Sequence, residues 1–117
     1  MLFQFILHPE KYVFTENCPV NVQPFVTINE KKGKSFIIEK TLAEQEDIGY
    51  IFPCCCIQLK QETALTAIGV TFQVAEILTK KKISCNVVAG FHHDYFFVPE
   101  IEAEKALNIL NAARLIS

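Results

Sequence analysis

The 117-residue sequence has no long block of one charge and no long apolar run. Its 11 Lys and Arg residues stand against 13 Asp and Glu residues, whereas nucleic-acid and anionic-membrane binding depend on clustered Lys and Arg. No apolar run approaches the ~20 residues that cross a bilayer. The short apolar opening lacks the basic start and the cleavage site of a signal peptide. We therefore expect a cytoplasmic protein without nucleic-acid or membrane partners.

The five cysteines lack the pattern of a disulfide framework and of a zinc site. Their number is odd and three of them are adjacent, at positions 54–56, whereas disulfide-rich domains favour an even number of separated cysteines. Zinc sites favour two-residue spacers, which are absent here. We expect free cysteines that act as small buried hydrophobic side chains, with redox sensitivity or adventitious metal binding as the alternatives. Neither a metal nor another cofactor is predicted.

What the sequence does have is a large hydrophobic fraction, 50% of the residues, with ten phenylalanines. This composition excludes a disordered chain. In the first part of the chain, the β-prone pattern predicts a short strand at residues 11–15. A hairpin follows, with strands at 25–29 and 35–39 and with Gly33 in the turn. A short helix with Thr41 as its N-cap is predicted next.

From residue 51 onward, the predicted order is strand, helix, strand, strand, helix. The segment IFPCCCIQLK is apolar on both faces, which is typical of a central strand. The segments KISCNVVAG and DYFFVP are predicted strands joined by a short connection, and EIEAEKALNILNAARL is a predicted helix. This order is the ferredoxin-like split β-α-β arrangement, with helices on one face of a sheet. The first part of the chain looks like an abbreviated copy whose first helix is missing or reduced.

The helix predicted between these strands, ETALTAIGVTFQVAEILTKKK, has an apolar stripe that should face the core. Gly69 lies beside this stripe, where the absence of a side chain would allow close packing. The stripe consists of Leu65, Ile68, Phe72, Ala75 and Leu78.

Two adjacent histidines and an aspartate, His92, His93 and Asp94, lie between two apolar segments. A metal site would need a third ligand on the same face, and a nucleophilic mechanism would need a group such as Cys85, which fits equally well as a core residue of its strand. Three alternatives remain. The side chains brace the connection between the strands, with Asp94 accepting backbone N–H groups; they contact a bound effector; or one histidine is an acid-base residue.

The motifs TALTAIGVTFQVAEIL, ISCNVVAGFHHDYFFVP and AEKALNIL together resemble a family of small uncharacterised bacterial proteins built from two ACT-like halves. The resemblance runs from about Tyr12 to Leu110. It implies an α+β, ferredoxin-like fold in two related halves, residues 1–50 and 51–117. Each half would have an antiparallel sheet with helices packed on one face, and one half can lend strands to the other.

ACT domains bind small effectors, usually amino acids, and transmit that binding to a partner. The resemblance therefore implies a stand-alone sensing or regulatory module for a small molecule, an amino acid in the first place, without catalysis of its own. The alternative is a small enzyme that uses His92 or His93 as an acid-base residue. A strand end that meets a helix N-terminus suits the carboxylate of an amino acid. The candidate ligand-binding residues at this place are Gln61, Glu62, Thr63, Asn86, Gly90, His92, His93 and Asp94.

The strand DYFFVP also indicates a binding partner. Its alternation places Tyr95 and Phe97 on one face and Phe96 and Val98 on the other. With helices on one side of the sheet only, the second face needs another cover. We therefore expect a homodimer, and the resemblance adds a regulated protein as a second kind of partner.

Overall fold

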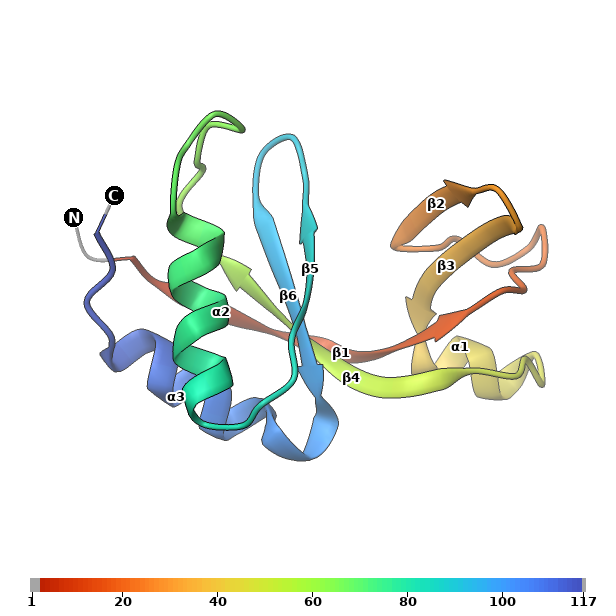
Figure 1. The fold of residues 1–117 in the computed structure, drawn as a ribbon. Helices are drawn as coiled ribbons and strands as arrows, with labels where there is room; N and C mark the ends of the chain where they lie inside the picture. Colours follow the sequence, from red (N-terminus) through yellow and green to blue (C-terminus); the bar gives the residue numbers. More distant parts are fainter. Residues whose placement is uncertain (1–2, 117) are drawn as a thin grey trace. The chain divides into compact units, whose positions relative to one another are not determined.

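The structure is a computed structural model that describes residues 3–116 (Figure 1). Its strands follow the hydrogen-bonded order β2-β3-β1-β4-β6-β5. The chain divides into two compact units. Pro9–Cys54 form one, here called the α1 unit, and the described residues up to His8 together with those from Cys55 onward form the other, the α2–α3 unit. The elements are β1 (Phe5–Thr15), β2 (Val26–Glu30), β3 (Gly33–Glu39), α1 (Lys40–Gln45), β4 (Ile51–Leu59), α2 (Val70–Lys80), β5 (Asn86–Ala89), β6 (Asp94–Pro99), the 3-10 turn η1 (Glu100–Glu102) and α3 (Ala103–Ala112).

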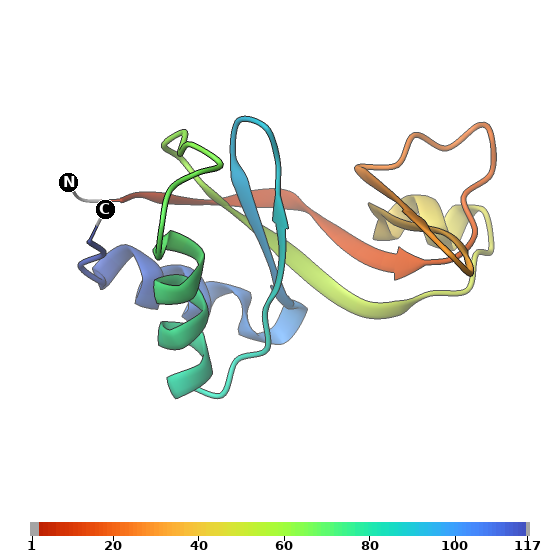
Figure 2. The ribbon, with the colours of Figure 1, turned by 45° about the horizontal axis from the view of Figure 1, so that its top comes forward.

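The α2–α3 unit has the predicted split β-α-β arrangement, with strand order β1-β4-β6-β5. Figures 1 and 2 show α2 and α3 packed on the same side of these strands. Alternate residues of β4 and β6 face the helices, because Ile57 and Phe96 share one buried cluster with Val74 and Leu110. Of the two pairs that alternation placed on opposite faces of β6, Phe96 and Val98 belong to this cluster, and both are fully buried.

The α1 unit has the strand order β2-β3-β1-β4 and one short helix. Its hairpin agrees with the sequence prediction, since β2 and β3 pair antiparallel up to Glu30 and Gly33. Gly33 has a φ of 130°, a conformation that favours glycine. Residues 16–25, between β1 and β2, contain neither a helix nor a strand. This loop stands where the sequence led us to expect a first helix that is missing or reduced.

The two long strands β1 and β4 contribute to both units, because the division between the units falls inside each strand. β1 is the first strand of the α1 unit and supplies a flanking strand to the α2–α3 unit. β4 is the first strand of the α2–α3 unit and supplies a flanking strand to the α1 unit. The expected lending of strands is thereby confirmed. The division of the sequence into halves at residue 50 stays a prediction, and the compact units exchange strands across it.

The predicted apolar stripe of the central helix is wrong in its first part. α2 begins only at Val70, and Gly69 is its N-cap with a φ of 88°, outside the helical region. The helix therefore buries Val70, Val74 and Leu78, at a spacing of four residues. Leu65, Ile68 and Phe72, which were expected in the core, are 67%, 93% and 65% exposed. An added Cβ at Gly69 would meet nothing closer than 3.9 Å, so its left-handed φ, and not close packing, accounts for the glycine.

Two further expectations in the first part of the chain differ from the structure. Thr41 lies inside α1, whose N-cap is Glu39, so the predicted N-cap is wrong. The strand predicted at residues 11–15 begins earlier, at Phe5. Pro9 lies within this strand, before the pairing of β1 with β3 begins at Tyr12.

The five cysteines are free thiols. Cys54, Cys55 and Cys56 are buried, and Cys18 and Cys85 are half-buried, as expected for small hydrophobic side chains. Burial raises the pKa of the Cys85 thiol to about 11. A thiol with so high a pKa stays protonated near neutral pH and is a poor nucleophile. None of the helices within residues 3–116 is long and apolar enough to cross a membrane.

Candidate functional site

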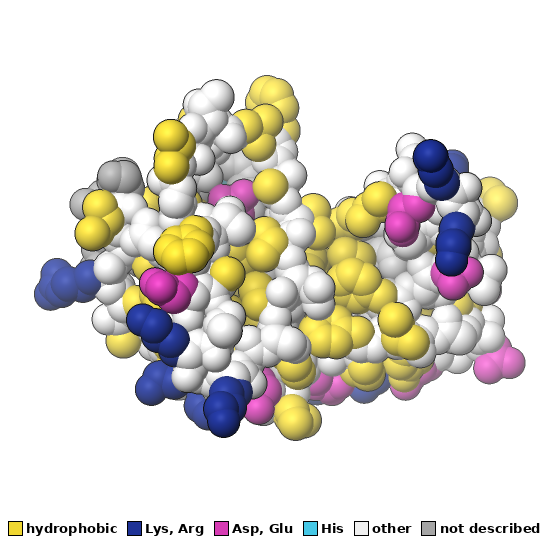
Figure 3. All heavy atoms as spheres, viewed as in Figure 1, with side chains coloured by type: hydrophobic (Ala, Val, Ile, Leu, Met, Phe, Trp, Pro, Cys, Tyr) yellow, Lys and Arg dark blue, Asp and Glu magenta, His cyan; other side chains and the backbone are white. Residues whose placement is uncertain are grey.

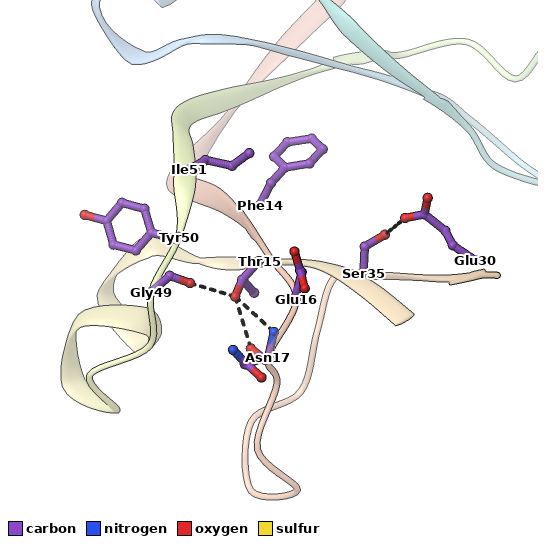
Figure 4. Close-up of a pocket in the computed structure, with 9 residues that line it drawn as sticks. All are labelled: Phe14, Thr15, Glu16, Asn17, Glu30, Ser35, Gly49, Tyr50 and Ile51. Carbon is purple, nitrogen blue, oxygen red and sulfur yellow. Dashed lines mark hydrogen bonds between the residues drawn. The ribbon is translucent and has the colours of Figure 1, made fainter. Parts of the chain in front are cut away.

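A cavity of about 580 Å³ lies in the α1 unit where β1 ends (Figure 4). We call it the β1 cavity. Three segments supply its wall: the end of β1 with the loop that follows, the β2–β3 hairpin, and the chain entering β4. Its volume falls in the range of small-molecule sites, about 300–1,000 Å³. The lining residues are Phe14, Thr15, Glu16, Asn17, Glu30, Ser35, Gly49, Tyr50 and Ile51.

Thr15 joins two of the three segments that line the cavity. Its hydroxyl donates to the carbonyl oxygen of Gly49 at 2.8 Å and accepts the backbone N–H of Asn17 at 3.1 Å. Thr15 is only 7% exposed, so both bonds are shielded from water. Figure 4 shows these bonds beneath the cavity. They hold the end of β1 against the start of β4.

The β1 cavity lies on the face of the sheet that turns away from α1. On the α1 face, Val13 and Ile38 pack against Ala43 of the helix. Side chains alternate between the two faces of a strand, so Phe14, next to Val13, points to the other face. Ser35 is three residues before Ile38 and therefore also points to the face away from α1.

Phe14 forms an aromatic wall of the cavity and is backed by a strained residue. Its ring meets the ring of Phe52 edge-on, with centroids 5.6 Å apart. Phe52 has a φ of 56° and precedes Pro53. A left-handed backbone costs a side-chain-bearing residue roughly 1–2 kcal/mol. The surrounding structure holds this strain, and the ring of Phe52 packs against the Phe14 wall.

The residues predicted to bind a ligand lie in the α2–α3 unit, and all except Asn86 lie on the turn after β4 or between β5 and the start of β6. The hydroxyl of Thr63 donates to Oδ2 of Asp94 at 3.1 Å. Asp94 is 7% exposed. The structure therefore brings the turn and the His-His-Asp segment together, as the order of elements predicted.

The two histidines have different neighbours. Nδ1 of His92 lies 3.2 Å from Oε1 of Glu62, and both side chains are exposed. Nδ1 of His93 lies 3.3 Å from the carbonyl oxygen of Leu59. These contacts tie the hairpin tip to the end of β4, which is the bracing arrangement considered from the sequence.

The other predicted residues are divided between this cluster and places outside it. Oε1 of Gln61 accepts the backbone N–H of Gln4 at 3.0 Å. The N–H of Gly90 donates to the carbonyl oxygen of His93 at 2.9 Å and closes the hairpin. Asn86 pairs with Phe97 at the far end of β5. At 3.2–3.4 Å per residue, Asn86 lies roughly 10 Å along the strand from the Asp94 pair, so the structure does not bring Asn86 to the others.

The β1 cavity and the β4 turn occupy equivalent places in their units. In each unit they lie where the first strand ends, beside the start of the third strand: Thr15 pairs with Phe36 of β3, and Leu59 contacts His93 just before β6. In the α2–α3 unit a helix follows this place, whereas in the α1 unit a loop with Pro19 and Pro24 follows. The repeat of the fold was the signal that could have pointed to the cavity residues from the sequence.

Comparison with known families identifies the fold. Residues 52–112 match an ACT domain, and residues 3–55 match a second ACT domain. The chain belongs to the ACT-domain family. The two ACT matches meet inside β4, the strand that contributes to both units. The resemblance to a protein of two ACT-like halves is confirmed, whereas no curated protein matches the sequence.

Solved structures agree with the ACT-domain assignment. A protein of unknown function from Vibrio cholerae, described as a possible transport protein, has a TM-score of 0.83 at 28% identity over 93% of this chain and 88% of that one. A protein from Agrobacterium tumefaciens has a TM-score of 0.75 at 18% identity over 92% and 86%. The regulatory subunit of aspartate kinase from Thermus thermophilus has a TM-score of 0.68 at 10% identity over 96% and 97%. The last two likenesses concern the fold alone.

Proposed function

We propose that this ACT-domain protein is a stand-alone regulatory module that binds a small molecule, an amino acid in the first place, and has no catalysis of its own. The observation that carries the proposal is the β1 cavity, which has the volume of a small-molecule site. Hydroxyl, amide and carboxylate groups line it together with aromatic and aliphatic side chains. A few polar groups in an otherwise apolar wall are typical of sites that orient a small ligand.

The surroundings of the histidines favour binding or bracing over catalysis. His92 contacts Glu62 in the turn after β4, His93 contacts the last residue of β4, and neither histidine lines the β1 cavity. Cys85, the nucleophile considered from the sequence, stays protonated because burial raises its pKa. The turn residues 61–63, Gly90 and the His-His-Asp segment form a second proposed contact region, and Asn86 lies outside it.

A thermal-shift screen against the twenty amino acids tests the proposal. Binding to the folded state should raise the melting temperature for at least one of them, since a ligand at 100 times its Kd adds about 2.7 kcal/mol to stability. The Ser35→Tyr variant places a ring in the β1 cavity and should abolish the shift. Its control, Asn29→Tyr, lies on the same hairpin with its side chain on the opposite face and should retain the shift.

The outcomes of this screen separate clearly. If no amino acid at a concentration of about 10 mM changes the melting temperature of the wild-type protein, the amino-acid proposal is wrong. If the ligand still raises the melting temperature of Ser35→Tyr, the ligand binds outside the β1 cavity, and the sensing function remains supported. Turnover of any added substrate that is lost in a His92→Gln, His93→Gln double variant would favour the enzyme alternative instead.

We also propose that the protein forms a homodimer. The face of β6 that carries Tyr95 and Phe97 was expected to need a partner, but it is already largely buried within the single chain. Phe97 is fully buried within the single chain, and Tyr95 is half-buried. The exposed apolar side chains include Leu65, Ile68 and Phe72, and Figure 3 shows hydrophobic side chains at the surface of α2 and of the loop before it. Sedimentation velocity at several concentrations checks whether a homodimer forms, and a single monomer species throughout would exclude it.

A further inference from the structure

We infer that the β1 cavity selects a ligand of net positive charge that carries a protonated amine on a short hydrocarbon chain, such as a basic amino acid or a diamine. This inference rests on the proposed binding function and names its ligand class. Three features of the cavity support it: the charges of its lining, a hydrogen bond that fixes one carboxylate, and its apolar wall.

The lining of the cavity carries two carboxylates and no basic side chain. Glu16 comes from the loop after β1, and Glu30 comes from the end of β2 (Figure 4). Within residues 3–116, neither of them forms an ion pair with a lysine or an arginine. Two carboxylates that share one cavity repel each other, and a cation between them removes that repulsion. An acidic ligand would add a third negative charge and is disfavoured.

The lysines of the same hairpin do not neutralise these carboxylates. Lys34 pairs with Asn29, and Glu30 pairs with Gly33, so Lys34 and Glu30 lie on opposite faces of the hairpin. Lys31 and Lys32 form the turn itself and are exposed to solvent. The hairpin thus separates its charges, with Glu30 on the cavity face and Lys34 on the other.

Glu30 is held in place before any ligand arrives. The hydroxyl of Ser35 donates to Oε2 of Glu30 at 2.6 Å, a short charge-assisted bond between two residues that both line the cavity. A carboxylate fixed in this way loses less conformational freedom when it accepts an ammonium group. Figure 4 shows the bond along the hairpin side of the cavity.

The remaining wall suits an organic cation. Phe14 and Ile51 supply the apolar side chains of the cavity, and Ile51 is 72% exposed. The ring of Tyr50 instead packs against the cluster under α1, and its hydroxyl donates to Glu44. A chain of four or five methylene groups would cover this apolar surface, and the ring of Phe14 adds attraction for an ammonium group. Among the described residues, no three His, Cys, Asp or Glu side chains gather as a metal site. The cation expected here is therefore an amine and not a bare metal ion.

Calorimetric titration with four probes tests the inference: L-lysine, putrescine, L-norleucine as the neutral analogue of lysine, and L-glutamate. We expect lysine and putrescine to bind at least tenfold more tightly than norleucine, and glutamate not to bind. Glu16→Gln and Glu30→Gln should each weaken lysine binding about tenfold, because each removes one charged hydrogen-bond acceptor. Glu104→Gln, an exposed position on α3, is the control and should leave the affinity unchanged.

The failure of this inference can be told apart from that of the proposed function. If norleucine or glutamate binds as well as lysine, or if both cavity variants bind lysine normally, the inference is overturned while amino-acid sensing stands. If none of the four probes binds and the screen of twenty amino acids is also empty, both are overturned. Melting curves of the variants without ligand show whether a loss of binding reflects unfolding.

Discussion

The hydroxyl of Thr63 and the carboxylate of Asp94 form a hydrogen bond of 3.1 Å across 31 positions of sequence. It joins the turn after β4 to the first residue of β6. Asp94 is 7% exposed, so water could replace the Thr63 hydroxyl only in part if that hydroxyl were removed. The bond fixes the turn that precedes α2.

Thr63→Val should lower the free energy of unfolding by about 1–2 kcal/mol, because it leaves a nearly buried carboxylate oxygen without this donor. Urea unfolding measures the change. Thr66→Val, an exposed threonine of the same loop, is the matched control and should change stability by less than about 0.5 kcal/mol. If both substitutions lower the free energy of unfolding equally, the hydrogen bond does not stabilise the turn as stated.

Gly90→Ala should destabilise the protein by about 1–3 kcal/mol, since its Cβ would meet backbone that cannot move away easily. The added Cβ would lie 3.0 Å from the carbonyl oxygen of His93 and 3.4 Å from the ring of Tyr95. Gly49→Ala is the control, because nothing lies within 4 Å of its Cβ position. Thermal unfolding should give Gly90→Ala a clearly lower melting temperature than Gly49→Ala. The reverse order would contradict the hairpin geometry.

Val74→Ala should cost about 1–3 kcal/mol, whereas Phe72→Ala should cost less than about 0.5 kcal/mol although it removes the larger side chain. Val74 is fully buried and Phe72 is 65% exposed on the same helix. Unfolding in guanidinium chloride measures both. If Phe72→Ala is the more damaging change in a protein shown to be monomeric, the placement of α2 from Val70 onward is wrong.

Cys85 should make stability depend on pH in the alkaline range. Burial raises the pKa of its thiol from 9.0 to about 11. Below pH 9 the thiol is protonated in both states and contributes no pH dependence; above it the unfolded chain ionises while the folded chain does not. The free energy of unfolding should therefore fall by about 2 kcal/mol more in the wild type than in Cys85→Ala between pH 8.5 and pH 11. Ser84→Ala is the control and should follow the wild type.

Much of the fold could be predicted from local patterns. The hairpin around Gly33 follows from two β-prone runs and a residue that accepts a positive φ. The faces of β4 follow from alternation, since Cys55, Ile57 and Leu59 all join the core under the helices. The start of α2 could not be predicted in this way, because the apolar stripe continues in sequence through Leu65 and Ile68 while the helix does not.

The candidate site was predictable only in part. The contact between Thr63 and Asp94 lies where the order of elements placed it. The β1 cavity was not predicted, because Phe14, Ser35 and Tyr50 come from three segments that have no shared motif.

The sequence by itself determined the order of strands and helices along the chain, the ACT-like resemblance and the shortening of the first half, because periodicity, turn residues and prolines act over a few neighbouring positions. Only the tertiary structure decided that β1 and β4 each contribute to two units and that Glu16 and Glu30 line one cavity. Strand pairing depends on backbone hydrogen bonds between distant segments, and these bonds leave little trace in the identity of single side chains.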